Sequence, residues 1–206
     1  MTPELLRQLI DEAEHDLPDL PEAILNVPGY SAPKVRRLLN ALCSHPGAVY
    51  LEIGVCYGST FIPAIYGNET RATCIDHWQM FAGSRAMFDA NVMQLIPDRE
   101  FTALAGDCFS DEIKAQVKRG VNVYFYDGAH DREAHYQAVM QYAPLLADRF
   151  VMLVDDWNWS EPNHGVKQAL DELGYTRFAE HNLPGAYNGD QAGWWNGLYV
   201  GLFQKA

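Results

Sequence analysis

The fold is decided by the stretch Leu51-Glu52-Ile53-Gly54-Val55-Cys56-Tyr57-Gly58-Ser59, a short apolar run that leads into a glycine-bearing loop. Glycines at positions 54 and 58 let the backbone turn tightly and approach a ligand closely. The dinucleotide fingerprint needs glycine where Cys56 stands, and the phosphate loop of ATPases needs a lysine that this stretch lacks. Because Glu52 adjoins the loop and would repel a phosphate, the stretch favours a nucleoside ligand that carries a positive charge.

Short apolar runs bounded by turn residues continue after this stretch, and segments of helical spacing separate them. Strands that alternate with helices are typical of a parallel, doubly wound α/β sheet. A further run at 198–203 follows the turn-rich segment 184–193 and is expected to pair with 175–178 as an antiparallel hairpin. The clearest helix is predicted at 132–146. The five predicted parallel strands are 48–53, 72–75, 101–105, 121–126 and 150–154.

At 206 residues the chain has the length of a single domain, 1–206, and no repeat or linker divides it. We expect an N-terminal helical cap or lid at 1–45, ahead of the α/β core at 46–206. Apolar residues at helical spacing begin at Leu5, and Ser31 is predicted to cap the second helix of this segment.

Charge and composition exclude several classes of protein. Lys and Arg number 15 against 27 Asp and Glu, a formal net charge of −12 that disfavours nucleic acid and anionic membranes as partners. The first residues do not have the pattern of a secretory signal, and no apolar stretch reaches membrane-spanning length, so we expect a cytoplasmic protein. The cysteines form no Cys-x-x-Cys pair and are expected to be buried free thiols; they are Cys43, Cys56, Cys74 and Cys108.

An acidic residue stands at or next to the end of every predicted parallel strand. Parallel strands end at one edge of the sheet, where doubly wound proteins bind their ligands. Because carboxylates that gather at one edge repel each other, the ligand should bring positive charge or many hydrogen-bond donors. The acidic residues at these strand ends are Glu52, Asp76, Asp107, Asp127, Asp155 and Asp156.

In this arrangement the chain resembles the class I S-adenosylmethionine-dependent methyltransferases. Glu52, Gly54 and Gly58 are similar to the first motif of that family, an acidic residue followed by Gly-x-x-x-Gly that wraps the methionine part of the cofactor. The resemblance implies that Asp76 holds the ribose hydroxyls and that Asp107 meets the adenine amino group. It also implies a Rossmann-like, seven-stranded sheet in the order 3-2-1-4-5-7-6. The expected cofactor site further includes Ser59, His77, Trp78, Cys108 and Asp127.

Asp127 and the pair Asp155-Asp156 are similar to the metal ligands of the metal-dependent O-methyltransferases, of the catechol type and of the macrolide and aminocoumarin sugar type. Three carboxylates form a hard oxygen site that is suited to Mg²⁺. The lysine base of the catechol type is absent, and His130 stands in its place as the candidate base. Alternatively, His130 caps the next helix or orders the Asp-Gly-Ala-His turn, and the aspartates are plain loop or cap residues.

The sequence therefore predicts an enzyme that transfers a methyl group from S-adenosylmethionine to an oxygen of a small-molecule acceptor with the help of Mg²⁺. Two alternatives stay open: a metal-independent N- or O-methyltransferase, and a non-catalytic S-adenosylmethionine-binding module. The resembled families commonly form homodimers, and they keep a mobile lid where Tyr30 and Ser31 stand. Four tryptophans are expected either to wall the acceptor pocket or to pack in the core: Trp157, Trp159, Trp194 and Trp195.

Overall fold

Seven strands form one mixed sheet in the computed structural model, which describes residues 1–205. The strand order is β3-β2-β1-β4-β5-β7-β6. Neighbours among the first five strands run parallel, and β7 runs antiparallel to both β5 and β6. The predicted α/β fold and its strand order are confirmed. The strands are β1 (Val49–Ile53), β2 (Arg71–Asp76), β3 (Thr102–Ala105), β4 (Val121–Tyr126), β5 (Leu146–Val154), β6 (Thr176–Leu183) and β7 (Leu198–Gln204).

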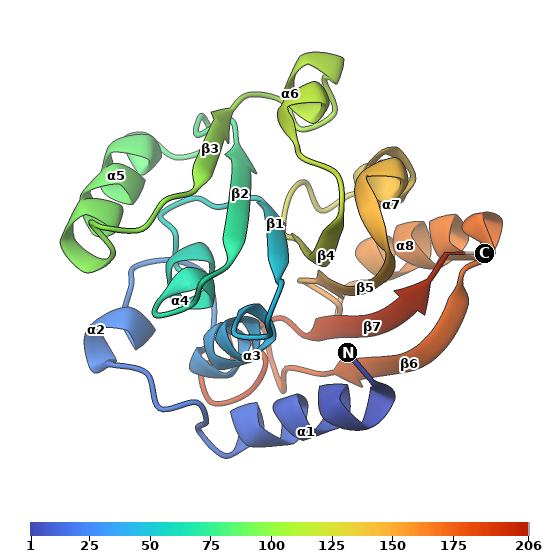
Figure 1. The fold of residues 1–206 in the computed structure, drawn as a ribbon, viewed down its shortest axis with the longest axis horizontal. Helices are drawn as coiled ribbons and strands as arrows, with labels where there is room; N and C mark the ends of the chain where they lie inside the picture. The colour runs from blue at the N-terminus through green and yellow to red at the C-terminus, as the bar shows by residue number, and fades with distance from the viewer. Residues whose placement is uncertain (206) are drawn as a thin grey trace.

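Helices cover both faces of this sheet (Figure 1). The first five helices contribute side chains to the core on one face, and the last three contribute to the core on the other face. The N-terminal helix α1 lies beside β6 at the edge of the sheet (Figure 1). The helices are α1 (Pro3–Glu14), α2 (Glu22–Leu25), α3 (Pro33–Cys43), α4 (Phe61–Ile65), α5 (Ser84–Leu95), α6 (Asp111–Gln116), α7 (Arg132–Tyr142) and α8 (Ser160–Leu173).

Consecutive residues of the central strands belong to different cores. In β1, Tyr50 packs in the core on the α3 and α4 side, whereas Leu51 packs on the α6 to α8 side. Phe125 and Tyr126 of β4 divide in the same way. Full burial of each such side chain contributes roughly 1.5–3 kcal/mol. The central strands are therefore anchored on both faces, and their carboxyl ends form a firm base for the loops that follow them.

The structure corrects two helix boundaries. The helix predicted at 132–146 ends at Tyr142, and a 3₁₀ turn (Ala143–Leu145) leads into β5, which begins four positions before the predicted residue 150. Pro144 explains this end, because proline has no backbone N–H to continue the helical ladder. Ser31 does not cap α3, since the cap residue is Ala32 and Pro33 occupies the first helical position. Proline favours that position, which leaves Ser31 one residue too early.

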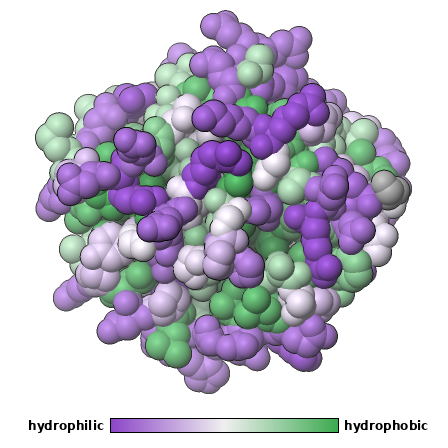
Figure 2. All heavy atoms as spheres, in the orientation of Figure 1, coloured by the Kyte–Doolittle hydropathy of each residue, from purple (hydrophilic) through white to green (hydrophobic). Residues whose placement is uncertain are grey.

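Polar side chains dominate the face of the molecule drawn in Figure 2, and hydrophobic ones appear between them in separate patches. None of the helices within residues 1–205 is both long enough and apolar enough to cross a membrane.

Candidate functional site

A cavity of about 520 Å³ opens at the carboxyl ends of the parallel strands. Residues at or just after the ends of β1, β2, β3, β4 and β5 line it, and Tyr30, Trp195 and Asn196 join them from distant parts of the chain. Glu52 and Gly58 are the predicted site residues that do not line the cavity. The other predicted site residues do: Gly54, Ser59, Asp76, His77, Trp78, Asp107, Cys108, Asp127, His130, Asp155 and Asp156.

Gly54 is required where β1 approaches β4. Its φ is +91°, and a Cβ at this position would overlap the carbonyl oxygen of Asp127. The Asp127 N–H donates to the Ile53 carbonyl at 2.8 Å, and the Gly54 N–H donates to the Ile75 carbonyl at 2.9 Å. Only glycine satisfies both the left-handed backbone and the close approach. The first glycine of the motif thus joins the ends of three strands beneath the cavity.

Glu52 lies beneath this loop rather than in the cavity wall, and it is fully buried. The Thr60 hydroxyl donates to Oε1 at 2.5 Å, and the Tyr50 hydroxyl donates to Oε2. Burial raises the pKa of the Glu52 carboxyl to about 8, although these two hydrogen bonds act in the opposite direction. Glu52 therefore anchors the residue that precedes α4, and it does so as a largely protonated acid at neutral pH.

Asp76 holds the glycine loop in place. One carboxylate oxygen accepts the backbone N–H groups of Val55 and Cys56 at 2.9 and 2.8 Å. The other oxygen accepts the Trp78 N–H at 2.6 Å. The Trp78 indole in turn donates to the Cys56 carbonyl at 2.9 Å and forms part of the cavity wall. The residue predicted to hold the ribose thus also fixes the loop that would surround the cofactor.

Three groups that could hold a metal ion converge in the wall of the cavity. Asp127, His130 and Asp156 each offer one ligand atom, and these atoms lie within 4.8 Å of one another. His130 Nε2 lies 2.9 Å from Asp156 Oδ2, and the Asn196 side-chain amide donates to Asp156 Oδ1 at 2.6 Å. Asp155 lines the same cavity but is not part of this group of three.

Burial and mutual repulsion destabilise the ionised forms of the aspartates in this part of the cavity. Burial, with the charges of Asp155 and Asp156, raises the pKa of Asp127 well above its ordinary value. Burial and Asp156 also raise the pKa of Asp155, whose Oδ1 has no hydrogen-bond partner within residues 1–205. The hydrogen bond to Asp156 raises the pKa of His130. A cation would relieve the repulsion among these carboxylates.

His130 is not the cap of α7, because Asp131 is the cap residue and its side chain accepts the Ala134 N–H at 2.9 Å. No sequence pattern selects Asn196, which the fold brings to Asp156 from 40 positions away. An Asn-Gly pair before a strand indicates a turn and no more.

The four tryptophans divide between packing and the cavity wall. Trp157 is buried and stacks on Tyr199 with ring centres 4.3 Å apart, and Trp194 is buried with its indole donating to Glu14. Trp159 and Trp195 line the cavity. The ring of Trp159 stands edge-on to His130 at 5.2 Å.

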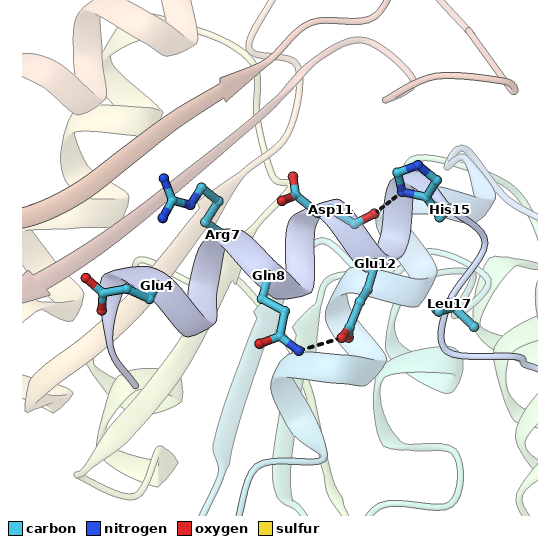
Figure 3. Close-up of a pocket in the computed structure, with 7 residues that line it drawn as sticks. All are labelled: Glu4, Arg7, Gln8, Asp11, Glu12, His15 and Leu17. Carbon is cyan, nitrogen blue, oxygen red and sulfur yellow. Dashed lines mark hydrogen bonds between the residues drawn. The ribbon is translucent and has the colours of Figure 1, made fainter.

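A second hollow of about 470 Å³ runs along the exposed side of α1 (Figure 3). Its polar groups pair within the helix: Gln8 donates to Glu12 at 2.8 Å, and His15 Nδ1 contacts the Asp11 carbonyl at 2.7 Å. No group of three metal-binding side chains is found there among residues 1–205. The hollow is shallow and carries no evident chemistry.

Comparisons with known proteins agree with this geometry. The family described as "Methyltransferase domain" matches residues 51–157, just over half of the chain. Comparison with curated proteins gives no match. The O-methyltransferase from Bacillus cereus, solved in complex with SAH, superposes with a TM-score of 0.68 at 13% identity, over 97% of this chain and 100% of that one.

Two further solved structures share the fold. The cofactor-bound Rv0187 protein from MTB gives a TM-score of 0.63 at 16% identity, over 98% of this chain and 89% of that one. Precorrin 8w decarboxylase from Methanobacterium thermoautotrophicum gives 0.60 at 17% identity, over 91% of this chain and 100% of that one. The matched segment begins in β1, just before the glycine loop, and ends just beyond Asp156. It therefore contains most of the residues that line the cavity. The chain belongs to the class I S-adenosylmethionine-dependent methyltransferase family.

Proposed function

We propose that this enzyme transfers a methyl group from S-adenosylmethionine to an oxygen of a small-molecule acceptor, assisted by a divalent cation. The observation that carries the proposal is the convergence of Asp127, His130 and Asp156 within one cavity whose other end is the glycine loop. A methyl donor held at the loop and an acceptor held at the three side chains would face each other inside it.

The cofactor would lie against the loop and the ends of β2 and β3. Gly54 and Ser59 line the cavity where the methionine part would lie, and Trp78 lines it where the adenosine would lie. Asp76 and Asp107 would accept hydrogen bonds from the ribose hydroxyls and the adenine amino group. The acidic wall would also favour the positive sulfonium over its neutral product.

The donor set fits a divalent cation. Asp127 and Asp156, whose oxygens lie within 4.8 Å of each other, would hold it together with the neighbouring Asp155, whose buried Oδ1 has no partner among residues 1–205. Carboxylate oxygens favour Mg²⁺, which keeps several waters or substrate oxygens in its shell. When bound, such a cation lowers the pKa of an acceptor hydroxyl and fixes its orientation.

His130 would take the proton from the acceptor hydroxyl as the methyl group is transferred. Asp156 holds the imidazole at 2.9 Å and stabilises its protonated form. The acceptor oxygen gains the methyl carbon, the sulfonium becomes a neutral thioether, and the positive charge passes with the proton to His130, so the contribution of the protein is chiefly to position the two groups in line.

One observation favours a metal-independent enzyme as the second candidate. Asp156 already has partners on both oxygens, His130 on one and Asn196 on the other. A carboxylate bound in this way can orient a histidine base without a cation, in the manner of an Asp-His pair.

Methyl transfer from labelled S-adenosylmethionine to a panel of hydroxylated small molecules tests the proposal, with and without EDTA and with Mg²⁺ added back. Turnover that EDTA abolishes and Mg²⁺ restores supports the metal-assisted reaction. Turnover that EDTA leaves intact supports the second candidate. Calorimetry that detects no binding of S-adenosylmethionine or its product would refute both.

A further inference from the structure

The wall of the cavity carries an unbalanced negative charge. Five aspartates and two histidines line it, and none of its lining residues within the described chain is Lys or Arg. Asp155, one of these acids, is buried, and its Oδ1 has no hydrogen-bond partner among residues 1–205. An anionic group that entered the cavity would meet five carboxyl side chains, and only the two histidines of the wall could offer it a positive charge.

Two arginines close to the lining residues are bound to other partners. Arg85 lies over the Trp78 ring at 4.5 Å and pairs with Asp89 at 2.9 Å, at the cofactor end. Arg132, two positions after His130, donates to Gln168 at 2.7 Å. Neither side chain lines the cavity, and each is bound to a polar partner outside its wall, Asp89 or Gln168.

Two indole side chains line the cavity, and hydrogen bonds hold the ring of Trp159 and the backbone of Trp195. Trp159 stands beside His130, and its Nε1 donates to Asn188 at 3.2 Å. Trp195 has a φ of +58°, and its backbone exchanges hydrogen bonds with Asp190 at 3.1 and 3.3 Å. Fixed indole faces bind flat apolar rings, and they attract cations more strongly than other aromatic rings do.

Resting on the proposed function, we infer that the acceptor is a neutral or cationic small molecule with a flat apolar ring, and that acceptors bearing a carboxylate or phosphate are rejected. The carboxylates supply the discrimination by charge, and the indoles supply the affinity for the ring. The sulfonium and a bound divalent cation together bring three positive charges against five carboxyl groups, so the wall keeps an excess of acidic groups.

Calorimetry on the protein saturated with S-adenosylhomocysteine and Mg²⁺ tests this inference in low-salt buffer. The probes are 4-(2-aminoethyl)catechol, 4-ethylcatechol and 3-(3,4-dihydroxyphenyl)propionate, which share a ring and two hydroxyls and differ in charge. We expect the amine and the neutral probe to bind at least about tenfold more tightly than the carboxylate, a difference of about 1.4 kcal/mol. Equal affinities, a preference for the carboxylate, or binding of none of the three at millimolar concentration would overturn the inference.

A matched pair of variants separates cavity charge from net charge. Met80 and Met93 are both exposed, at 68% and 76%, but only Met80 lines the cavity. Met80→Lys should reduce the preference for amine over carboxylate about threefold or more, whereas Met93→Lys should leave it unchanged. Equal effects of the two variants would show that the preference for amine over carboxylate comes from the net charge of the whole protein. If the natural protein does not bind S-adenosylhomocysteine, the proposed function is refuted. If it binds S-adenosylhomocysteine but does not discriminate between the probes by charge, only this inference is refuted.

Discussion

Glu52→Gln is expected to flatten the dependence of stability on pH. The pKa of Glu52 rises from 4.5 to about 8 in the folded protein because the carboxyl is buried. Between these two values the folded protein retains a proton that the unfolded chain has released. The free energy of unfolding therefore falls as pH increases through this range, by at most about 1.4 kcal/mol per pH unit, or about 5 kcal/mol in all.

Glutamine is neutral at every pH and close to the protonated acid in shape, so the variant lacks this dependence. The amide oxygen still accepts from one of the hydroxyls of Tyr50 and Thr60, whereas the other must rotate to accept from the amide N–H, and this cost of about 1–3 kcal/mol does not vary with pH. The stability of the variant relative to the natural protein should therefore increase by about 3 kcal/mol between pH 5 and pH 7.5.

Urea unfolding of both proteins at several pH values measures this difference. Glu100→Gln removes an exposed carboxylate from the same chain and serves as the control, with a difference expected to stay within about 0.5 kcal/mol across the range. If the free energy of unfolding changes with pH in the same way in the natural protein and in Glu52→Gln, Glu52 is ionised in the folded state and the reasoning is refuted.

Three further substitutions probe the site. Gly54→Ala should destabilise the protein by about 3 kcal/mol and abolish S-adenosylhomocysteine binding, measured by urea unfolding and calorimetry, because a Cβ there overlaps the Asp127 carbonyl; normal binding would contradict the role of this glycine. His130→Gln should lower kcat about 10²–10⁴-fold, whereas Asp131→Ala should cost about 1 kcal/mol of stability through the lost cap and leave kcat unchanged. Trp78→Phe removes the bond to the Cys56 carbonyl and should weaken S-adenosylhomocysteine binding with about 1 kcal/mol lost in stability; an unchanged Kd would mean that the indole only packs.

The sheet was predictable because its strands are encoded by local runs of apolar residues between turns. Val121–Tyr126 was predicted at its observed bounds. The early start of β5 was not, because Leu146 and its neighbours follow a helix directly and only the 3₁₀ turn around Pro144 separates them. Periodicity alone does not distinguish the end of a helix from the start of a strand when no polar turn lies between them.

The residues of the candidate site could be predicted where they stand at or just after the end of a strand, as Asp76 and Asp127 do. Two aspects needed the three-dimensional structure. Glu52 has the position of a motif residue, but the alternation of side chains along β1 turns it toward the core, where Thr60 and Tyr50 surround it. Asn196 reaches Asp156 only because β7 lies beside β5.

The division of the cavity has a consequence for how this enzyme could change over time. Some residues that line the cavity lie outside the matched segment 51–157, namely Tyr30, Trp159, Trp195 and Asn196. Others, such as Gly54, Asp76 and Asp107, lie within it. On the proposed function, substitutions at Trp195 would alter which molecules are modified and would leave the residues that line the cofactor site unchanged. New acceptor preferences can therefore arise, or be engineered, in one region of the chain while the chemistry encoded in the other stays constant.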